Sequence, residues 1–257
     1  MFSDVPSENV ATSGSLDRRT RKRVARRELL LDLAADLVEQ LGVDGVTMAA
    51  LAEAGDYAPA SLYTYFSSRS ALLAALQQRA LVTLGEVAEA QLVTWDAAVD
   101  ALVERPAEPV VALARLWAFA DLFHAAPERH PREFRLQQQL LVTAGAEESA
   151  DAATVVPVAM VVLDVPRRLL AAAVDAGALH PHRPVVDPLD QPVDGALVRT
   201  LAWVVALHGA LLVDGLTTGL PFAGDTLGSE LTDSLLRGWG AEPDALSAAR
   251  DLAHGWV

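Results

Sequence analysis

The chain has 257 residues, of which 52% are hydrophobic, and it carries a formal net charge of −14 and no cysteine. The lack of cysteine excludes disulfides and thiolate metal sites. Apolar stretches such as 153–163 are broken by proline or charge before the roughly 18 residues of a membrane span, and 1–17 lacks the apolar segment of a secretory signal. We therefore expect a cytoplasmic protein, whose Ala- and Leu-rich composition favours helix.

The charges are unevenly distributed. Residues 1–69 carry a net charge of −2 and residues 70–257 a net charge of −12, whereas 18–27 (RRTRKRVARR) holds seven basic side chains and no acidic one. A basic arm on an acidic body is typical of a DNA-binding protein with a separate second domain, although a solvated basic tail would have the same composition. The arm residues expected to contact DNA, along its backbone or in its minor groove, are Arg18, Arg19, Arg21 and Lys22.

The N-terminal part of the chain predicts a compact three-helix unit. Residues 1–17 are polar and aperiodic, so we expect them to be disordered. A long helix follows and ends at Gly42, a residue type suited to a left-handed C-terminal cap. Thr47 is a good N-cap for a second helix over 48–54, and Pro59 suits the first turn of a third helix. Short turns between three helices are typical of a helix-turn-helix unit.

The rest of the chain also predicts helices. The third helix should reach about Phe66, and Ser68 can cap a fourth helix from Arg69 to about Val93. Proline or glycine punctuates most later junctions, and 178–193 is expected to be a proline-rich loop. The later helices are expected at about 108–126, 131–144, 152–177, 194–217, 226–239 and 243–256. The predicted fold is all-α, with an N-terminal three-helix helix-turn-helix domain and a larger C-terminal helical bundle.

The stretch 41–72, LGVDGVTMAALAEAGDYAPASLYTYFSSRSAL, is the most informative part of the sequence. It has a glycine after its first helix, a threonine-capped helix with an L-A-E core, and S-L-Y-T-Y-F after a tight turn. This succession resembles the DNA-binding domain of the tetracycline-repressor (TetR) family of transcription regulators. The residues that match the family pattern are Gly42, Thr47, Leu51, Ala52, Glu53, Ser61, Leu62, Tyr63, Tyr65, Phe66, Ser68, Arg69 and Leu72.

Two positions depart from the family pattern. Asp56 stands where the turn glycine would fall, and Ala60 replaces the glycine before the Ser/Thr position. Aspartate tolerates a left-handed backbone better than most residues, so the turn can still form. Alanine at position 60 should raise helicity rather than break the fold.

The third helix is the expected recognition helix, which would lie in the major groove. Leu51, Leu62 and Phe66 should bury inward and set the angle between the two helices. Hydroxyl groups can bind phosphates, although Tyr65 could equally be a core residue. Because 58–66 contains no Arg, Lys, Asn or Gln, base reading would depend on hydroxyls, thymine methyls, DNA shape and the arm. The expected contacts of this region are Thr47, Ala58, Pro59, Ala60, Ser61, Tyr63, Thr64, Tyr65 and Arg69.

The resemblance implies a DNA-binding domain at 18–69, which includes the basic arm, and an effector-binding and dimerisation domain at 70–257. The segment 202–209, AWVVALHG, is similar to a Trp-x4-His-Gly stretch in late helices of many family members. The region 194–239 is expected to form a homodimer that reads a palindromic operator in double-stranded DNA. Small residues there would permit close approach, but they could equally pack inside one subunit.

An unidentified small-molecule effector is expected to bind between helices of the second domain. Aromatic residues at helical spacing are usually core, whereas a polar group within an apolar helix needs a partner and is a better candidate. His208 could equally be a structural histidine. The expected effector contacts are Trp117, Asp121, Phe123, His124, Met160, Leu163, Arg167 and His208, with Phe119, Phe134 and Leu140 as further candidates.

The sequence contains no enzyme signature such as GxxxxGK[ST], HExxH or GxSxG. No cofactor is expected. His180 and His182 could bind a metal with Asp187 or Asp190, but we interpret this loop as solvated surface. The leading hypothesis is therefore a dimeric repressor that a small molecule releases from DNA. The alternatives are a ligand-independent or activating regulator, an all-α protein-interaction module, and an all-α enzyme with a fortuitous basic N-terminus.

Overall fold

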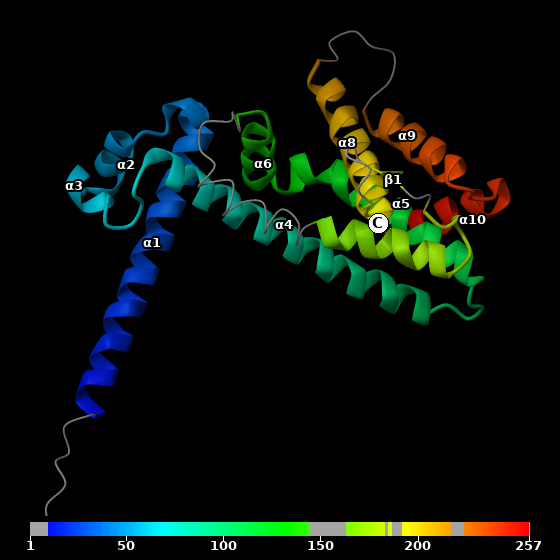
Figure 1. Ribbon diagram of the computed structural model, residues 1–257, viewed down its shortest axis with the longest axis horizontal. Helices are drawn as coiled ribbons and strands as arrows, with labels where there is room; N and C mark the ends of the chain where they lie inside the picture. Colours follow the sequence, from blue (N-terminus) through cyan, green and yellow to red (C-terminus); the bar gives the residue numbers. More distant parts are fainter. Residues whose placement is uncertain (1–9, 144–162, 183–184, 187–191, 217–223, 257) are drawn as a thin grey trace, which may run out of the picture. The chain divides into compact units, whose positions relative to one another are not determined.

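The computed structural model describes residues 10–143, 163–182, 185–186, 192–216 and 224–256 (Figure 1). The chain divides into two compact units, which are described separately below. The first unit comprises Met1–Arg79 and Leu136–Val155, and the second comprises Ala80–Arg135 and Val156–Val257. Helices dominate the described residues, which confirms the predicted all-α fold.

The first unit begins with helix α1, Val10–Gly45, which contains a kink at Gly42 (φ 74°, ψ 172°). A positive φ costs glycine little, and the regular helix is interrupted at this residue, where the sequence predicted its end. The helix starts earlier than expected, because residues 10–17, predicted to be disordered, are already helical. The basic segment 18–27 continues the same helix (Figure 1). Its Arg, Lys and Ala residues are good helix formers, and the sequence predicted a long helix after residue 17, so the basic arm is part of that helix.

Helix α2, Met48–Gly55, has the cap that the sequence predicts. The Thr47 side chain accepts a hydrogen bond from the backbone N–H of Ala50 at 3.0 Å. The helix ends at Asp56, whose backbone is left-handed (φ 54°, ψ 45°) and whose N–H donates to the carbonyl of Glu53. Asp56 therefore forms the turn in place of the expected glycine.

Helix α3 is shorter than predicted and spans only Pro59–Leu62. Residues 63–65 form turns, although the Phe66 N–H still donates to the Leu62 carbonyl at 3.0 Å. Aromatic and β-branched residues disfavour regular helix in this stretch, and side-chain bonds to the backbone compete with it. Helix α4, Arg69–Asp100, then begins after Ser68, whose hydroxyl accepts from the Ala71 N–H at 3.0 Å, and it runs beyond the predicted end.

Leucines at helical spacing build the core of the first unit. Leu51 and Leu62 are 0% exposed and Phe66 is 2% exposed, which confirms the predicted inward face of the helix-turn-helix. Each fully buried leucine contributes about 1.5–3 kcal/mol by leaving water, so this core holds the short α3 in place. Other fully buried side chains of the unit are Leu30, Leu31, Leu72 and Leu76.

The second unit is a bundle in which α5, Glu108–Arg129, packs against α10, Pro243–His254, and also contacts α8, Gly195–Leu216, and α9, Gly224–Gly238. A helix over 163–175 adds Leu170 to the core. The helices α8 and α9 lie side by side (Figure 1).

Further elements complete this description. Helix α6 spans Pro131–Thr143 and contributes its residues up to Arg135 to the second unit. The predicted loop 178–193 contains a short antiparallel pair, β1 (Val185–Val186) and β2 (Pro192–Val193), with Val185 opposite Val193.

Candidate functional site

The helix-turn-helix leaves the predicted DNA-facing residues accessible. Tyr63 is 55% exposed although it is a large aromatic residue, which indicates that its ring is not needed in the core. Tyr65 is half-buried, so it has both a packed side and an accessible side. The remaining predicted contacts are exposed at Thr47, Ala58, Pro59, Ala60 and Thr64 and half-buried at Ser61.

Two hydroxyls of this surface donate to the backbone of their own turn. Ser61 Oγ donates to the Ala58 carbonyl and Thr64 Oγ1 to the Ser61 carbonyl, both at 2.7 Å. A hydroxyl has one proton, so each oxygen retains only its capacity to accept. In the major groove, the groups that donate are the amino groups of cytosine and adenine.

Arg69 has a different role from the one predicted. Its Nε donates to the Val46 carbonyl at 2.6 Å and its Nη2 to the Val43 carbonyl at 2.7 Å, and the side chain is half-buried. Arg69 thus ties the C-terminal end of α1 and the residue that follows it to the start of α4. This geometry does not support the predicted phosphate contact.

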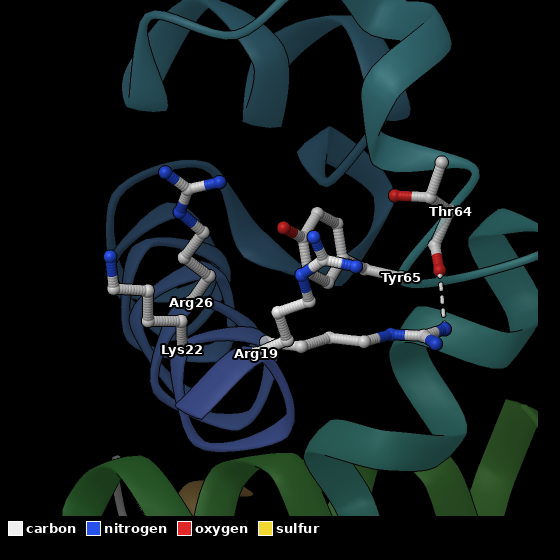
Figure 2. A pocket seen from close by; sticks show the side chains of 6 residues that line it. Arg19, Lys22, Arg26, Thr64 and Tyr65 are labelled. Atoms are coloured by element: carbon white, nitrogen blue, oxygen red, sulfur yellow. Dashed lines mark hydrogen bonds between the residues drawn. The ribbon is translucent and has the colours of Figure 1, made fainter. Parts of the chain in front are cut away.

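The most basic surface of the first unit lies on one face of α1, beside the turn that follows α3 (Figure 2). Four cations line this surface, and the second, third and fourth follow the first by three, four and seven residues. This spacing places all four on one side of a helix. They form an open pocket of about 440 Å³, in which the Tyr65 ring lies close to the guanidinium groups. We call this set the basic face: Arg19, Lys22, Arg23 and Arg26.

Two contacts fix the basic face relative to the helix-turn-helix. Arg23 Nη2 donates to the Thr64 carbonyl at 3.0 Å, and the Arg27 guanidinium carbon lies 5.2 Å from the centre of the Phe66 ring. Arg19, Lys22 and Arg26 are exposed and have no ion pair within the described part of the chain. Their charges are therefore available to an anion.

Sequence reasoning missed Arg23 and Arg26 as members of this surface. The signal was present in the spacing of the cations, which places Arg19, Lys22, Arg23 and Arg26 on one side of a helix. Arg18 and Arg21, which were predicted as contacts, are exposed but do not line the pocket.

The second unit brings some of the predicted effector residues together. The Phe123 and His208 rings meet edge to face with centroids 4.7 Å apart, and the Phe134 and His208 rings are stacked at 6.2 Å. Phe123 also contacts His124, at 6.5 Å. Burial lowers the pKa of His208, since an apolar environment disfavours the charged imidazolium. We call Phe123, Phe134 and His208 the aromatic cluster.

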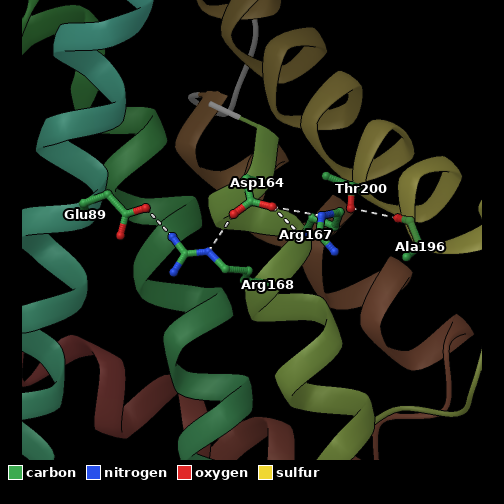
Figure 3. Close-up of polar contacts among 6 residues, drawn as sticks. All are labelled: Glu89, Asp164, Arg167, Arg168, Ala196 and Thr200. Carbon is green, nitrogen blue, oxygen red and sulfur yellow. Dashed lines mark hydrogen bonds and ion pairs between the residues drawn. The ribbon is translucent and has the colours of Figure 1, made fainter. Parts of the chain in front are cut away.

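Trp117 and Arg167 do not belong to this cluster. Trp117 is buried, with the Arg250 guanidinium 4.2 Å above its ring, which is a core contact. The guanidinium of Arg167 bonds to Asp164, and Arg168 connects the same carboxylate to Glu89 (Figure 3). The charge of Arg167 is thus already balanced, which argues against the predicted effector contact.

The remaining predicted residues are dispersed. Asp121 and Leu163 are half-buried. His124 packs so closely on α9 that a Cβ at Gly228 would lie 2.0 Å from its ring. Met160 lies outside the described residues, as does the side chain of Leu140. In the part of the chain that the structure describes, no group of three or more His, Cys, Asp or Glu side chains could hold a metal ion, and Asp187 and Asp190 lie outside it.

Helix α8 carries an apolar stripe on its exposed side. Val205 is 66% exposed and Leu212 is 58% exposed, although the helix is highly apolar. Over the described residues, α5 and the segment Gly195–Val213 are long and apolar enough to cross a membrane, but this is weak evidence, because core helices of soluble proteins pass the same test. The exposed residues of the stripe, at helical spacing, are Val198, Leu201, Ala202, Val205, Gly209 and Leu212.

The buried packing between α2 and α3, the exposed turn after α3 and the adjacent basic face together define a helix-turn-helix DNA-binding protein. Residues 30–76 match the family model of the bacterial regulatory proteins of the tetR family. The helix-turn-helix region of this chain is therefore a DNA-binding domain of the tetR-family type, as the sequence predicted. No curated protein matches the sequence at a significant level.

Solved structures are similar over most of the chain. The fatty acid degradation regulator FadR from Bacillus halodurans is 14% identical, with a TM-score of 0.55 over 82% of this chain and 98% of that one. RolR in complex with resorcinol is 22% identical (TM-score 0.52; 91% and 95% covered). SmeT, the repressor of the Stenotrophomonas maltophilia multidrug efflux pump SmeDEF, is 18% identical (TM-score 0.52; 85% and 92% covered). At these identities the likeness shows the fold.

Proposed function

We propose that this protein is a cytoplasmic, homodimeric repressor that a small molecule releases from a palindromic operator. The observation that carries the DNA-binding part is the basic face, whose unpaired cations are held beside an exposed recognition turn. Residues 18–69 would form most of the DNA-binding surface, and residues 70–257 would bind the effector and the second subunit. The steps of this proposal rest on different observations, and each is tested separately.

The recognition turn would enter the major groove, which is about 12 Å wide. Tyr63 would donate its exposed hydroxyl to a phosphate, and the Thr47 hydroxyl, whose oxygen already accepts from Ala50, would donate its proton to another. The amino groups of bases would be read by the accepting oxygens of Ser61 and Thr64. Arg69 has no place in this arrangement, because it is bonded to backbone carbonyls.

The basic face would contact the DNA backbone. An α-helix with its side chains is about 10–12 Å across, whereas the minor groove is about 6 Å wide. Because 18–27 is helical, it cannot thread into that groove as an extended arm would. Of the two modes predicted from the sequence, contact along the backbone is therefore favoured.

The apolar stripe of α8 would be the dimer interface. Contiguous exposed apolar surface usually marks an interaction site, and two-fold dimers use the same patch on both subunits. A Cβ at Gly209 would meet no atom within 4 Å, so the described fold does not itself require glycine there. Close approach of a partner helix would explain the small residue.

The effector would bind at the aromatic cluster of the second unit. RolR, a protein of the same fold, has been solved with resorcinol, which supports the idea that such a domain holds a small organic molecule. Release from DNA would follow if the ligand favours a subunit arrangement whose recognition turns do not match the operator. A regulator that acts as an activator, or without a ligand, remains the alternative.

The DNA-binding proposal is tested by incubating the full-length protein with a random pool of DNA duplexes and sequencing the bound fraction. We expect one enriched motif with two-fold symmetry. Failure to enrich any sequence would contradict the proposal. Operator affinity measured with and without candidate small molecules then separates a ligand-released repressor from a ligand-independent regulator.

The dimer is tested by sedimentation of Val205→Lys and Leu212→Lys variants. A buried lysine without a partner is costly, so we expect the dimer to dissociate and operator affinity to fall. Val103→Lys is the matched control, since Val103 is fully exposed and lies outside α8. Unchanged sedimentation of the α8 variants would refute the proposed interface.

A further inference from the structure

The position of the proton on His208 follows from a hydrogen bond within α8. His208 Nδ1 lies 2.9 Å from the carbonyl oxygen of Val204, one helical turn earlier. A carbonyl only accepts, so Nδ1 carries the proton and the neutral ring has its lone pair on Nε2. Burial favours this neutral form by lowering the pKa of His208. His208 therefore presents an acceptor.

This acceptor has no partner within the described part of the chain. His208 Nε2 is buried and makes no hydrogen bond there. The two rings that pack on the imidazole, Phe123 and Phe134, contain no hydrogen-bond donor. A buried polar atom without a partner is unfavourable, and native proteins usually satisfy it.

The neighbouring tryptophan on the same helix is satisfied. Trp203 is 0% exposed, and its Nε1 donates to Thr232 Oγ1 on α9 at 3.2 Å. The two polar rings of the AWVVALHG segment thus differ. Trp203 Nε1 has a hydrogen-bond partner, whereas His208 Nε2 has none within the described part of the chain. This difference points to His208 Nε2 as the atom to which an external molecule donates a hydrogen bond.

We propose that the effector is an uncharged ring compound whose hydroxyl donates a hydrogen bond to His208 Nε2, with its ring packed on Phe123 and Phe134. The inference rests on the proposed effector site and names its ligand class, a phenol or a cyclic alcohol. A carboxylate has no proton to donate at neutral pH. The one arginine among the predicted effector contacts, Arg167, is already bonded to Asp164.

The test uses three probes of the same ring size on the full-length protein. Phenol has a donating hydroxyl, anisole has an ether oxygen that only accepts, and toluene has neither. We expect calorimetry to show phenol binding about tenfold more tightly than anisole and toluene, because only phenol satisfies the buried acceptor. In protein labelled with ¹⁵N-histidine, phenol should move the Nε2 resonance of His208 upfield, and toluene should not.

Variants separate this role from a structural one. His208→Phe keeps a ring but removes the acceptor, so phenol should lose its advantage while toluene binding stays within about twofold. His208→Gln keeps an acceptor and should retain part of the advantage, which remains informative if the phenylalanine variant is unstable. His254→Phe, at an exposed position on α10, is the matched control and should leave the preference unchanged.

Three outcomes would overturn the inference. They are equal binding of phenol and anisole, a preference that survives His208→Phe, and an Nε2 resonance that is already hydrogen-bonded and that no probe moves, as expected for an ordered water. Failure of all three probes to bind would also overturn it. Enrichment of an operator by the same protein would still support the DNA-binding proposal, so the two failures are distinguishable.

Discussion

Removing the charges of the basic face should flatten the salt dependence of DNA binding. The variant is the triple substitution Arg19→Ala, Lys22→Ala and Arg26→Ala, which spares Arg23 because that side chain is bonded to the Thr64 carbonyl. Each DNA phosphate that a protein neutralises adds about 0.9 to the slope of log K against log salt concentration. The three cations would neutralise one phosphate if they share it and three if each contacts a different one. The slope should therefore fall by about 0.9–2.7 per subunit, or about 2–5 for a dimer.

The assay is a series of gel shifts or anisotropy titrations on one operator between about 50 and 200 mM salt, the range over which such slopes are usually compared. Over this fourfold range, the wild-type affinity should fall about 10- to 1,000-fold further than that of the variant. The sequence preference should not change, because phosphates carry no sequence information. The variant should be folded, since these side chains are exposed.

The matched control removes three exposed arginines of the second unit, Arg105, Arg129 and Arg135, and so changes the net charge equally. If both triple variants lower the slope alike, the effect reflects net charge and the basic face has no special role. An unchanged slope in the α1 variant would refute the assignment of this surface to the DNA backbone.

Three further predictions concern stability. Asp56→Ala should lower the free energy of unfolding by about 1 kcal/mol, measured in urea, because alanine tolerates the left-handed backbone less well, whereas Asp56→Gly should be neutral or stabilising. Arg69→Met should cost about 1–3 kcal/mol by leaving the Val43 and Val46 carbonyls without their donor, and a lower salt slope in this variant would instead indicate a phosphate contact. Below the ordinary histidine pKa of about 6.5, the unfolded chain binds a proton that native His208 resists. Stability should therefore fall as the pH drops below about 6.5, and His208→Phe should reduce that fall in urea titrations repeated across pH.

The parts of the fold that local physical chemistry determines were predictable from the sequence. Thr47 and Ser68 cap helices because their hydroxyls accept backbone N–H groups nearby. Asp56 can adopt the left-handed turn because its short polar side chain tolerates this backbone conformation better than most residue types do. In each case the signal lies within a few residues of the position, so no knowledge of tertiary contacts is required.

The predictions that failed depended on distant partners. Arg69 bonds to carbonyls 23 and 26 residues earlier in the chain, and nothing near it in sequence indicates this. Arg167 is the exception, because its partner Asp164 lies three residues earlier within the helix predicted over 152–177, so the spacing alone could have indicated this ion pair. Arg23 and Arg26 were missed because their place on the surface depends on Thr64 and Tyr65, about 40 residues later in the chain.

The recognition surface has an unusual division of hydrogen-bonding roles that only the folded turn reveals. The hydroxyls of Ser61 and Thr64 donate to backbone carbonyls, so in the proposed complex they would meet the DNA as acceptors. The exposed Tyr63 hydroxyl has no such bond within the described residues and could donate or accept. With two acceptors and no bidentate reader, direct discrimination between bases is small. Most of the sequence preference must then come from DNA shape, to which the fixed spacing between the recognition turn and the basic face is sensitive. Because Arg23 and Arg27 fix that spacing through their contacts with Thr64 and Phe66, we expect them to influence specificity without touching a base.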